Sequence, residues 1–304
     1  AGFFWSGQMK RKEIKVTITL AGKNEGGQSL VFSGAHNQMS AVGLRVYCDI
    51  MSGFGAIAPT AQIRIYGLAL EKMTKLLRVR WNTLGALMNR VKIEVGEQGE
   101  TLHTEFEGNI TFAYPDCANA PDVALMIEAQ TAIIHNKKAA KPSVHKGAVN
   151  VSKVVEEIAT DMGFQLENNG VSIMTENVTL NGVNLEKLRR LSNDRGFDFY
   201  LDAGVVVIVP KGGERKLASP IITPTTGLIG YPVPDARGVT FKCLYDPLLR
   251  FGGPCKIRDS VVDVCNGDWR IYGIRKSLES NQPNGNWFCE VAATWKDSKD
   301  ATIK

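Results

Sequence analysis

The sequence is organised around residues 150–163, NVSKVVEEIATDMG, which predict an amphipathic helix. Its apolar residues recur every three or four positions and therefore share one face of the helix. Asn150 is a residue type that caps a first turn, and Gly163 is one that ends a last turn. The apolar stripe consists of Val151, Val154, Val155, Ile158, Ala159 and Met162.

A second helix is expected from Asn184 to Gly196. Asn184 favours a helix start, and Gly196 favours a helix end. Three leucines recur on one face, and three arginines near the carboxyl end suit the negative end of the helix dipole. The leucines are Leu185, Leu188 and Leu191, and the arginines are Arg189, Arg190 and Arg195.

Short strands complete a module around the two helices. One strand is expected at 164–167, between the helices. Behind the second helix, apolar segments at 197–201 and 205–209 flank Asp202-Ala203-Gly204, which predicts a β-hairpin. Residues 141–213 therefore predict a small α/β domain.

The segment before this module alternates apolar and polar residues over many short runs, which predicts about seven strands and few helices. A closed barrel or a sandwich is the fold that such a segment forms. One short helix is expected after Gly67, with Leu70, Met73, Leu76 and Leu77 on its apolar side. The strands are expected at 13–20, 30–32, 42–50, 61–66, 91–95, 102–112 and 123–133.

The segment after the module is also strand-like, and Gly, Pro, Asn and Asp separate its strands. Its strands are expected at 220–222, 239–244, 255–257, 269–274 and 287–295. A polar, basic stretch at 135–142 ends in proline and is typical of a linker. We therefore predict a mainly β fold, α+β overall, in which two tube-like β-barrel domains flank a small α/β domain. The predicted domains are 1–136, 137–213 and 214–304.

The composition is that of an ordinary globular protein. The 304 residues have a formal net charge of +5 and a pI near 8.8, a mild basic excess that does not by itself indicate a nucleic-acid partner. Six cysteines include no CxxC pair, and we expect reduced cytosolic thiols. We expect no secretory segment, because Ala1-Gly2-Phe3-Phe4-Trp5 is too short for the apolar region of one, and no membrane insertion, because no apolar run reaches bilayer-spanning length.

The motifs do not predict a catalytic site. Gly53-Phe54-Gly55-Ala56-Ile57-Ala58 matches a dinucleotide-binding pattern in letters, but Pro59 and a strand follow where a helix has to begin. His103, Glu105 and Glu107 alternate along one face of a strand, which is compatible with a metal site. The solvent side of a half-buried strand is the commoner cause of this pattern. We therefore predict no enzyme activity, no cofactor and no metal site.

Basic side chains near the linker and on the second helix form a weak nucleic-acid signal. Neither an aromatic platform nor a known nucleic-acid-binding module accompanies them. The favoured interpretation is that these side chains are solvated and that those on the helix also interact with the helix dipole. These residues are Lys137, Lys138, Lys141, Lys146, Lys187, Arg189 and Arg190.

Several stretches in combination resemble the baseplate hub family of contractile-tailed phages and related tail machines. The stretches together cover most of the chain, and each stretch alone is a weak indication of the family. They are IRIYGL (63–68) with the helix behind it, GNITFAY (108–114), NAPDV (119–123), residues 182–191 and 205–210 of the module, TGLIGYP (226–232), LYDP (244–247) and Gly252-Gly253.

This resemblance implies a homotrimer in which two similar barrels per subunit form a pseudo-sixfold ring. Such a ring would join the hexameric tail tube protein to the trimeric central spike protein in the virion baseplate, after assembly in the bacterial cytoplasm. The resemblance also implies tape measure and baseplate wedge proteins as partners, and DNA that passes through the lumen without specific binding. The alternative is a tail-associated protein that binds or cleaves peptidoglycan, with the α/β module as its wall-binding part.

Residues 53–60 are expected to form a long loop between two strong strands. Phe54 and Ile57 are its apolar residues. Because apolar loop tips are costly in a monomer, these two residues are the candidate contacts to another subunit or to the tube.

Overall fold

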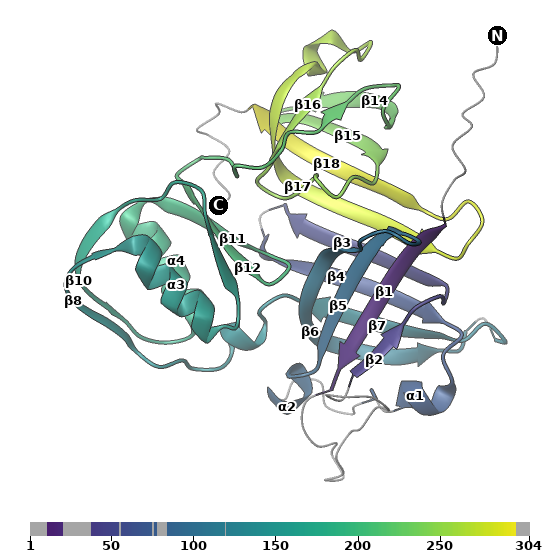
Figure 1. Ribbon diagram of the computed structural model, residues 1–304, viewed down its shortest axis with the longest axis horizontal. Coiled ribbons are helices and arrows are strands. Elements are labelled where there is room, and N and C mark those ends of the chain that lie inside the picture. The colour runs from purple at the N-terminus through teal and green to yellow at the C-terminus, as the bar shows by residue number, and fades with distance from the viewer. Residues whose placement is uncertain are drawn as a thin grey trace.

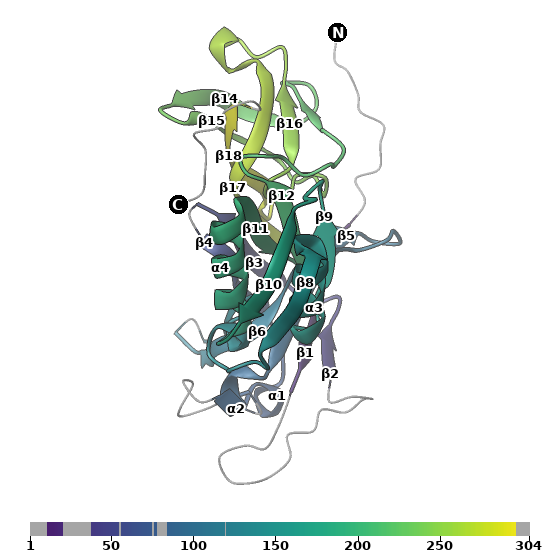
Figure 2. The same cartoon turned by 90° about the vertical axis from the view of Figure 1, so that its left-hand side faces the viewer.

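The computed structural model describes residues 11–20, 38–54, 56–74, 76–77, 84–118 and 120–295, with the backbone alone for residues 38, 39, 56, 57, 84 and 86. Strands dominate the described residues, which confirms the mainly β class. Thirteen strands form one sheet, and an α/β insert lies against the side of this sheet (Figures 1 and 2).

The first β unit has a core built by alternation. Val46, Cys48 and Ile50 are buried on one face of their strand, as predicted, but Val42 lies outside the strand and is half exposed. The predicted strand at 30–32 lies outside the described residues. The unit comprises β1 (Lys12–Thr19), β2 (Gln38–Ala41), β3 (Val46–Gly53), β4 (Ala56–Tyr66), α1 (Leu70–Thr74), α2 (Leu84–Leu87), β5 (Arg90–Glu97), β6 (His103–Asp116) and β7 (Ala124–Gln130).

Two predictions for this unit are wrong in part. The segment 53–60 is a tight hairpin rather than a long loop, because β4 begins at Ala56 and pairs with β3. In the short helix, Met73 and Leu76 are buried, but Leu70 and Leu77 are exposed. The helix α1 has only five residues, so fewer of its side chains contact the core than the sequence pattern predicted.

The insert is a three-layer unit. Figure 1 shows its two helices between a two-stranded ribbon, β10-β8, and a three-stranded sheet, β11-β12-β9. Every residue of the predicted stripe from Val151 to Met162 is buried. The insert comprises η2 (Ile134–Asn136), β8 (Ser143–Asn150), α3 (Val151–Asp161), β9 (Gln165–Asn168), β10 (Met174–Leu180), α4 (Asn184–Arg195), β11 (Phe197–Asp202) and β12 (Val205–Pro210).

The caps of the insert helices agree with the sequence at three of four ends. The Asn150 side chain accepts a hydrogen bond from the Ser152 backbone nitrogen at 2.9 Å, and Gly163 and Gly196 adopt positive φ behind the two helices. Asn184 is the exception, because it is the first helical residue and its amide donates to Asp161 at 2.6 Å. The strands β8 and β10 were not predicted, since no residue of β8 is buried and its exposure shows no clear alternation.

The second β unit has its own core, which includes Val239, Phe241, Ile271 and Val291. The sequence did not predict β14. The unit comprises β13 (Ile221–Ile222), β14 (Leu228–Asp235), β15 (Gly238–Leu244), β16 (Pro254–Ile257), η3 (Asp263–Cys265), β17 (Gly267–Ser280) and β18 (Trp287–Trp295).

The two β units share one sheet, because β17 pairs antiparallel with β3. The strand order is β14-β15-β18-β17-β3-β4-β7-β6-β5-β1-β2. Pairings between the described strands do not close either unit into a barrel. The cores of the units cross the predicted domain limits: Ala132 packs in the insert core, and Tyr200 of the insert packs in the core of the second unit. The limits at 136/137 and 213/214 therefore stay predictions.

The two units are topological repeats. Along the sheet, β14-β15-β18-β17 corresponds to β3-β4-β7-β6. In each unit a shorter strand pairs with the first half of the 14-residue strand, β5 with β6 and β16 with β17. The β-bulges also correspond, between Ile110 and Phe112 in one unit and between Ile271 and Gly273 in the other.

Candidate assembly interface

Phe54 lies at the tip of the β3–β4 hairpin and contacts the second β unit. Its ring covers Gly273 so closely that a Cβ atom there would lie 2.6 Å from Phe54 Cε1. The Phe54 backbone nitrogen donates to the Tyr272 carbonyl at 3.2 Å. The side chain remains 48% exposed. The Ile57 side chain lies outside the described part of the structure, so the interface role of both residues stays a prediction.

The predicted face of His103, Glu105 and Glu107 does not form one site. His103 is exposed, and Glu107 forms an ion pair with Arg90. Glu105 is buried because the register of β5 and β6 shifts beside it, which takes this residue out of the alternation. The solvent-side prediction is therefore wrong for Glu105. Among the described residues, His, Cys, Asp and Glu side chains form no group of three that could hold a metal ion.

Glu105 is instead the centre of a charged junction between the two β units. Its carboxylate pairs with Lys276 of β17, whose side chain is also buried. The same carboxylate accepts from the Tyr245 hydroxyl at 2.7 Å and from the Arg250 guanidinium at 3.1 Å. Arg250 also donates to the Thr104 carbonyl at 3.1 Å. Four groups from distant parts of the chain therefore meet at one point.

The junction continues into the insert through Asp202 of β11. Asp202 lies 3.6 Å from Arg250 and accepts from Arg215 at 2.7 Å. Arg215 follows the insert in the chain and binds Glu167 of β9 with both arms of its guanidinium, at 2.9 and 2.5 Å. Such two-pronged pairing fixes orientation as well as distance. The junction thus ties the insert to both β units.

Charges in this junction balance. It holds three carboxylates, on Glu105, Asp202 and Glu167, and three cations, on Lys276, Arg250 and Arg215. Burial alone would raise the pKa of Asp202, but Arg250 and Arg215 outweigh it and hold that pKa below its ordinary value. The pKa of Glu167 is also lowered, because hydrogen bonds from Arg215 and Asn169 overcome the effect of burial. At neutral pH both carboxylates are ionised and compensated. We interpret the junction as a structural clamp.

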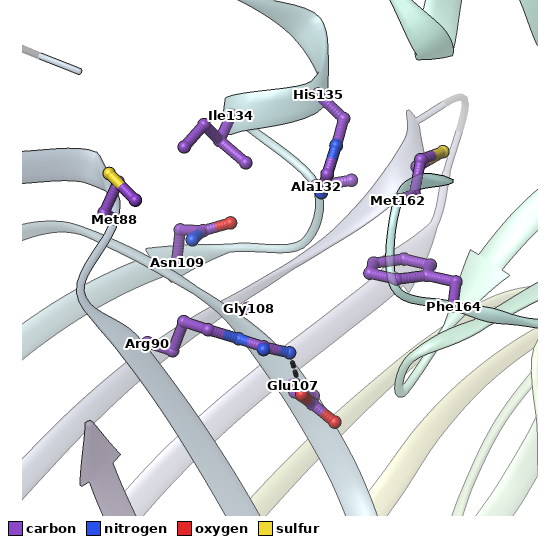
Figure 3. A pocket seen from close by; sticks show the side chains of 10 residues that line it. All are labelled: Met88, Arg90, Glu107, Gly108, Asn109, Ala132, Ile134, His135, Met162 and Phe164. Atoms are coloured by element: carbon purple, nitrogen blue, oxygen red, sulfur yellow. Dashed lines mark hydrogen bonds and ion pairs between the residues drawn. The ribbon is translucent and has the colours of Figure 1, made fainter. Parts of the chain in front are cut away.

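A pocket of about 150 Å³ lies where the first β unit meets the insert (Figure 3). Figure 3 shows His135 at the top of the pocket and the Arg90–Glu107 pair at the bottom, with Asn109 between them. Burial, helped by Arg90 and Lys138 and opposed by Asp161, lowers the pKa of His135, so its imidazole is neutral at pH 7. The lining residues include no Ser, Thr or Cys. The pocket therefore holds no hydroxyl or thiol nucleophile that His135 could activate as a base. The remaining lining residues are Met88, Gly108, Ala132, Ile134, Met162 and Phe164.

Two of the basic residues that carried the nucleic-acid signal have partners within the insert. Lys187 is buried, and its ammonium donates to the Lys141 carbonyl and lies 3.4 Å from the Ser143 hydroxyl. The prediction of a solvated Lys187 is therefore wrong. Arg189 pairs with Glu186 one turn earlier at 3.6 Å. Buried Lys187 therefore adds no cation to a basic surface.

Apolar and aromatic side chains are exposed on several strands of the long sheet, among them β14 and β6. On the outermost strand β14, Tyr231 is 70% exposed and Val233 is 58% exposed. On the second half of β6, Tyr114 is 39% exposed. Sequence patterns did not single out these residues, because β14 was not predicted and an exposed aromatic at a strand end is common. Exposed apolar residues at sheet edges mark contact surfaces.

The described helices include none that could span a membrane. All six cysteines are free thiols, and Cys117 is the one that is exposed.

Comparison with family profiles gives a match for this sequence. A profile of the family described as baseplate hub gp41 matches residues 13–290, which is most of the chain. No curated protein matches the sequence.

Solved structures of tail proteins share the fold. The 43 kDa tail protein of prophage MuSo2 from Shewanella oneidensis superposes with a TM-score of 0.59 at 10% identity, over 95% of this chain and 98% of that one. A tail protein from Neisseria meningitidis MC58 gives 0.55 at 11% identity, over 93% and 96%. The E. coli c3393 protein gives 0.54 at 14% identity, over 84% and 74%, and is described as a component of the type VI secretion system that resembles the T4 phage tail proteins gp27 and gp5.

Proposed function

The chain belongs to the baseplate hub gp41 family, and from this premise we propose that three copies form a pseudo-sixfold ring between a hexameric tail tube and a trimeric central spike. Family membership makes the protein a structural component of a phage tail baseplate. The ring, the contractile tail and the assembly in the bacterial cytoplasm are the finer parts of the proposal.

The topological repeat is the observation that carries this proposal. Each chain contributes two four-stranded units to one continuous sheet. Three chains then supply six similar units, which suits a tube with sixfold symmetry on one side and a spike with threefold symmetry on the other. The E. coli c3393 protein, described as similar to tail proteins gp27 and gp5, supports a place among tail proteins. Tape measure and baseplate wedge proteins are the further partners proposed.

The broad face of the sheet supports unspecific passage of DNA. On this face Asp49 accepts from Arg275 at 2.5 Å, and Glu279 accepts from Arg45 at 3.0 Å. Proteins hold DNA mainly through cations that neutralise phosphates. Arginines already paired with carboxylates attract phosphates weakly. In the proposed ring this face lines the lumen, and the duplex slides past it.

The mass of the purified full chain under native conditions tests the ring. We expect a trimer whose population rises with protein concentration. A chain that stays monomeric, both in isolation and when extracted gently from assembled particles, would contradict the proposal.

We also propose that the protein has no catalytic activity. Because the family is a structural hub, the decisive experiment is a positive one. Reproducible, metal-dependent lysis of purified cell walls, abolished by His103→Ala, would overturn this part of the proposal. Glu100→Ala, at another exposed position near the same strand, is the control.

A further inference from the structure

We infer that Cys243 and Cys289 are a site of reversible covalent modification, in which a small peroxide converts the two thiols into a disulfide that joins β15 to β18. The two cysteines lie in the core of the second β unit, and both are free thiols in this structure. The register of the two strands, the hydrogen bond between the thiols and the charges beside Cys289 support this inference. It concerns the single chain and does not depend on the proposed ring.

The strand register places the two cysteines directly opposite each other. Cys243 pairs with Cys289 in the antiparallel ladder of β15 and β18. Two positions further along, the Tyr245 backbone nitrogen donates to the Trp287 carbonyl at 3.1 Å, which marks a hydrogen-bonded pair. Because such pairs recur at every second position, Cys243 and Cys289 form one too. The Cα atoms of a hydrogen-bonded pair are about 5.5 Å apart, close to the commonest separation in disulfides.

The two thiols already contact each other. Neither side chain is more than 1% exposed, so both point into the same core. The Cys243 thiol donates a hydrogen bond to the Cys289 sulfur. Formation of the disulfide therefore needs rotation of the side chains and no movement of either strand.

The groups around Cys289 make it the nucleophile of the pair. Burial and the nearby Glu105 carboxylate would raise the pKa of its thiol. The hydrogen bond from Cys243, the Lys276 ammonium and the backbone N–H of Asp246 outweigh both effects, so the pKa of Cys289 is lowered. The hydrogen bond to Cys289 and burial raise the pKa of Cys243. One sulfur thus favours the reactive thiolate, while the other keeps its proton.

The oxidation proceeds in two balanced steps. The Cys289 thiolate attacks one oxygen of hydrogen peroxide, so that an S–O bond forms, the O–O bond breaks and hydroxide leaves. The Cys243 thiol then attacks the sulfur of this sulfenic acid. An S–S bond forms, and the sulfenic hydroxyl leaves as water with the proton of Cys243. The two sulfurs together lose two electrons, and the peroxide is reduced to water and hydroxide.

Burial of the pair selects a small oxidant. Hydrogen peroxide is close to water in size, whereas a bulky disulfide reagent has no exposed sulfur to approach at Cys243 or Cys289. Cys117, by contrast, is exposed. In the folded chain, the pair should therefore react with hydrogen peroxide and resist oxidised glutathione.

The disulfide would staple the part of the chain that carries half of the charged junction. It closes the segment 243–289, which contains Arg250 and Lys276, and both of these residues bind Glu105 of the first β unit. A cross-link restricts the unfolded chain, and the effect grows with the length of the closed segment. We expect oxidation to raise the midpoint of thermal unfolding by about 5 °C or more.

Peptide mapping tests the site. The full chain with Cys117→Ser is treated with hydrogen peroxide under native conditions, alkylated, and digested with trypsin without reduction. Cleavage after Lys and Arg places each of the four cysteines of this core in its own peptide, at 243–250, 251–256, 259–270 and 277–296. We expect peptide 243–250 to be linked to peptide 277–296, and dithiothreitol to release the link.

Substitutions of single cysteines give the controls. Cys243→Ala and Cys289→Ala should each abolish the linked peptide and the rise in the thermal midpoint. Cys265→Ala, which removes another buried thiol of the same core, is the matched control and should keep both. A link that forms only in the denatured chain, a link through Cys255 instead, or oxidation of Cys289 without any link would overturn the inference.

Discussion

Glu105 of the first β unit and Lys276 of the second form an ion pair in which neither side chain is more than 5% exposed. An ion pair so deeply buried is sensitive to the loss of one partner, because the remaining charge stays in the interior. Replacement of Lys276 therefore tests whether the junction clamps the two units.

Lys276→Met should lower the free energy of unfolding by about 3–5 kcal/mol. The neighbouring Arg275→Met removes an ion pair whose arginine is 49% exposed, and should cost about 1 kcal/mol or less. Urea denaturation of both variants makes the comparison. Equal losses would show that burial of the Glu105–Lys276 pair has no special importance.

The junction should also make stability depend on acid. The pKa values of Glu167 and Asp202 are lower in the folded protein than their ordinary values of 4.5 and 3.8, so the unfolded chain takes up protons first as the pH falls. Their stabilisation is therefore complete above about pH 5 and is lost as the pH falls through the folded pKa values.

Arg215→Met checks the source of this dependence. Without its cation Glu167 loses the main group that lowers its pKa, and Asp202 keeps only Arg250 and Lys276 for that effect, so the difference in unfolding free energy between wild type and variant should shrink from pH 7 to pH 4. Arg215→Lys keeps the charge and should lie between them. A difference that is constant with pH would refute the assignment.

Gly273→Ala should disturb the hairpin tip, because the new Cβ would lie 2.6 Å from the Phe54 ring. Overpacking of this kind costs about 1–3 kcal/mol. Gly85→Ala is the control, since its Cβ would meet nothing within 4 Å and a helical glycine generally gains stability on this change. If Phe54 is the obstacle, adding Phe54→Ala should recover part of the loss in thermal denaturation.

Ile158→Ala should cost about 2–5 kcal/mol, because Ile158 is 1% exposed in the core of the insert. Glu156→Ala, on the exposed side of the same helix, should change stability by less than about 0.5 kcal/mol. Denaturant titration separates the two. A negligible loss for Ile158→Ala would mean that helix α3 is not packed.

The insert helices were predictable because their apolar residues recur with the helical period, as the burial of Val154 and Leu188 confirms. Strands with one buried face, such as β1 and β3, were predictable for the corresponding reason. The ribbon strand β8 was not, since exposure on both faces leaves no period to detect.

Glu105 was misplaced because a strand pattern assumes strict alternation, and one bulge breaks it. Two similar β units were expected, but their residue-by-residue correspondence was hidden for a related reason. It is defined by pairing and bulge positions, whereas the residues at equivalent places differ, with tyrosine at position 114 and arginine at position 275. Contacts such as Glu105 with Lys276 join residues far apart in the chain, which local periodicity does not report.

The pairing of β3 with β17 has a consequence for biosynthesis. Val46 pairs with Ser280, so the ribosome has to synthesise the insert and most of the second β unit before β3 acquires its second neighbour. Until then β3 is an open edge that a second nascent chain can occupy. Pairing between strands so distant in sequence is also slow. Expression at reduced temperature should therefore raise the yield of soluble protein, because cooling weakens the apolar contacts through which open edges associate.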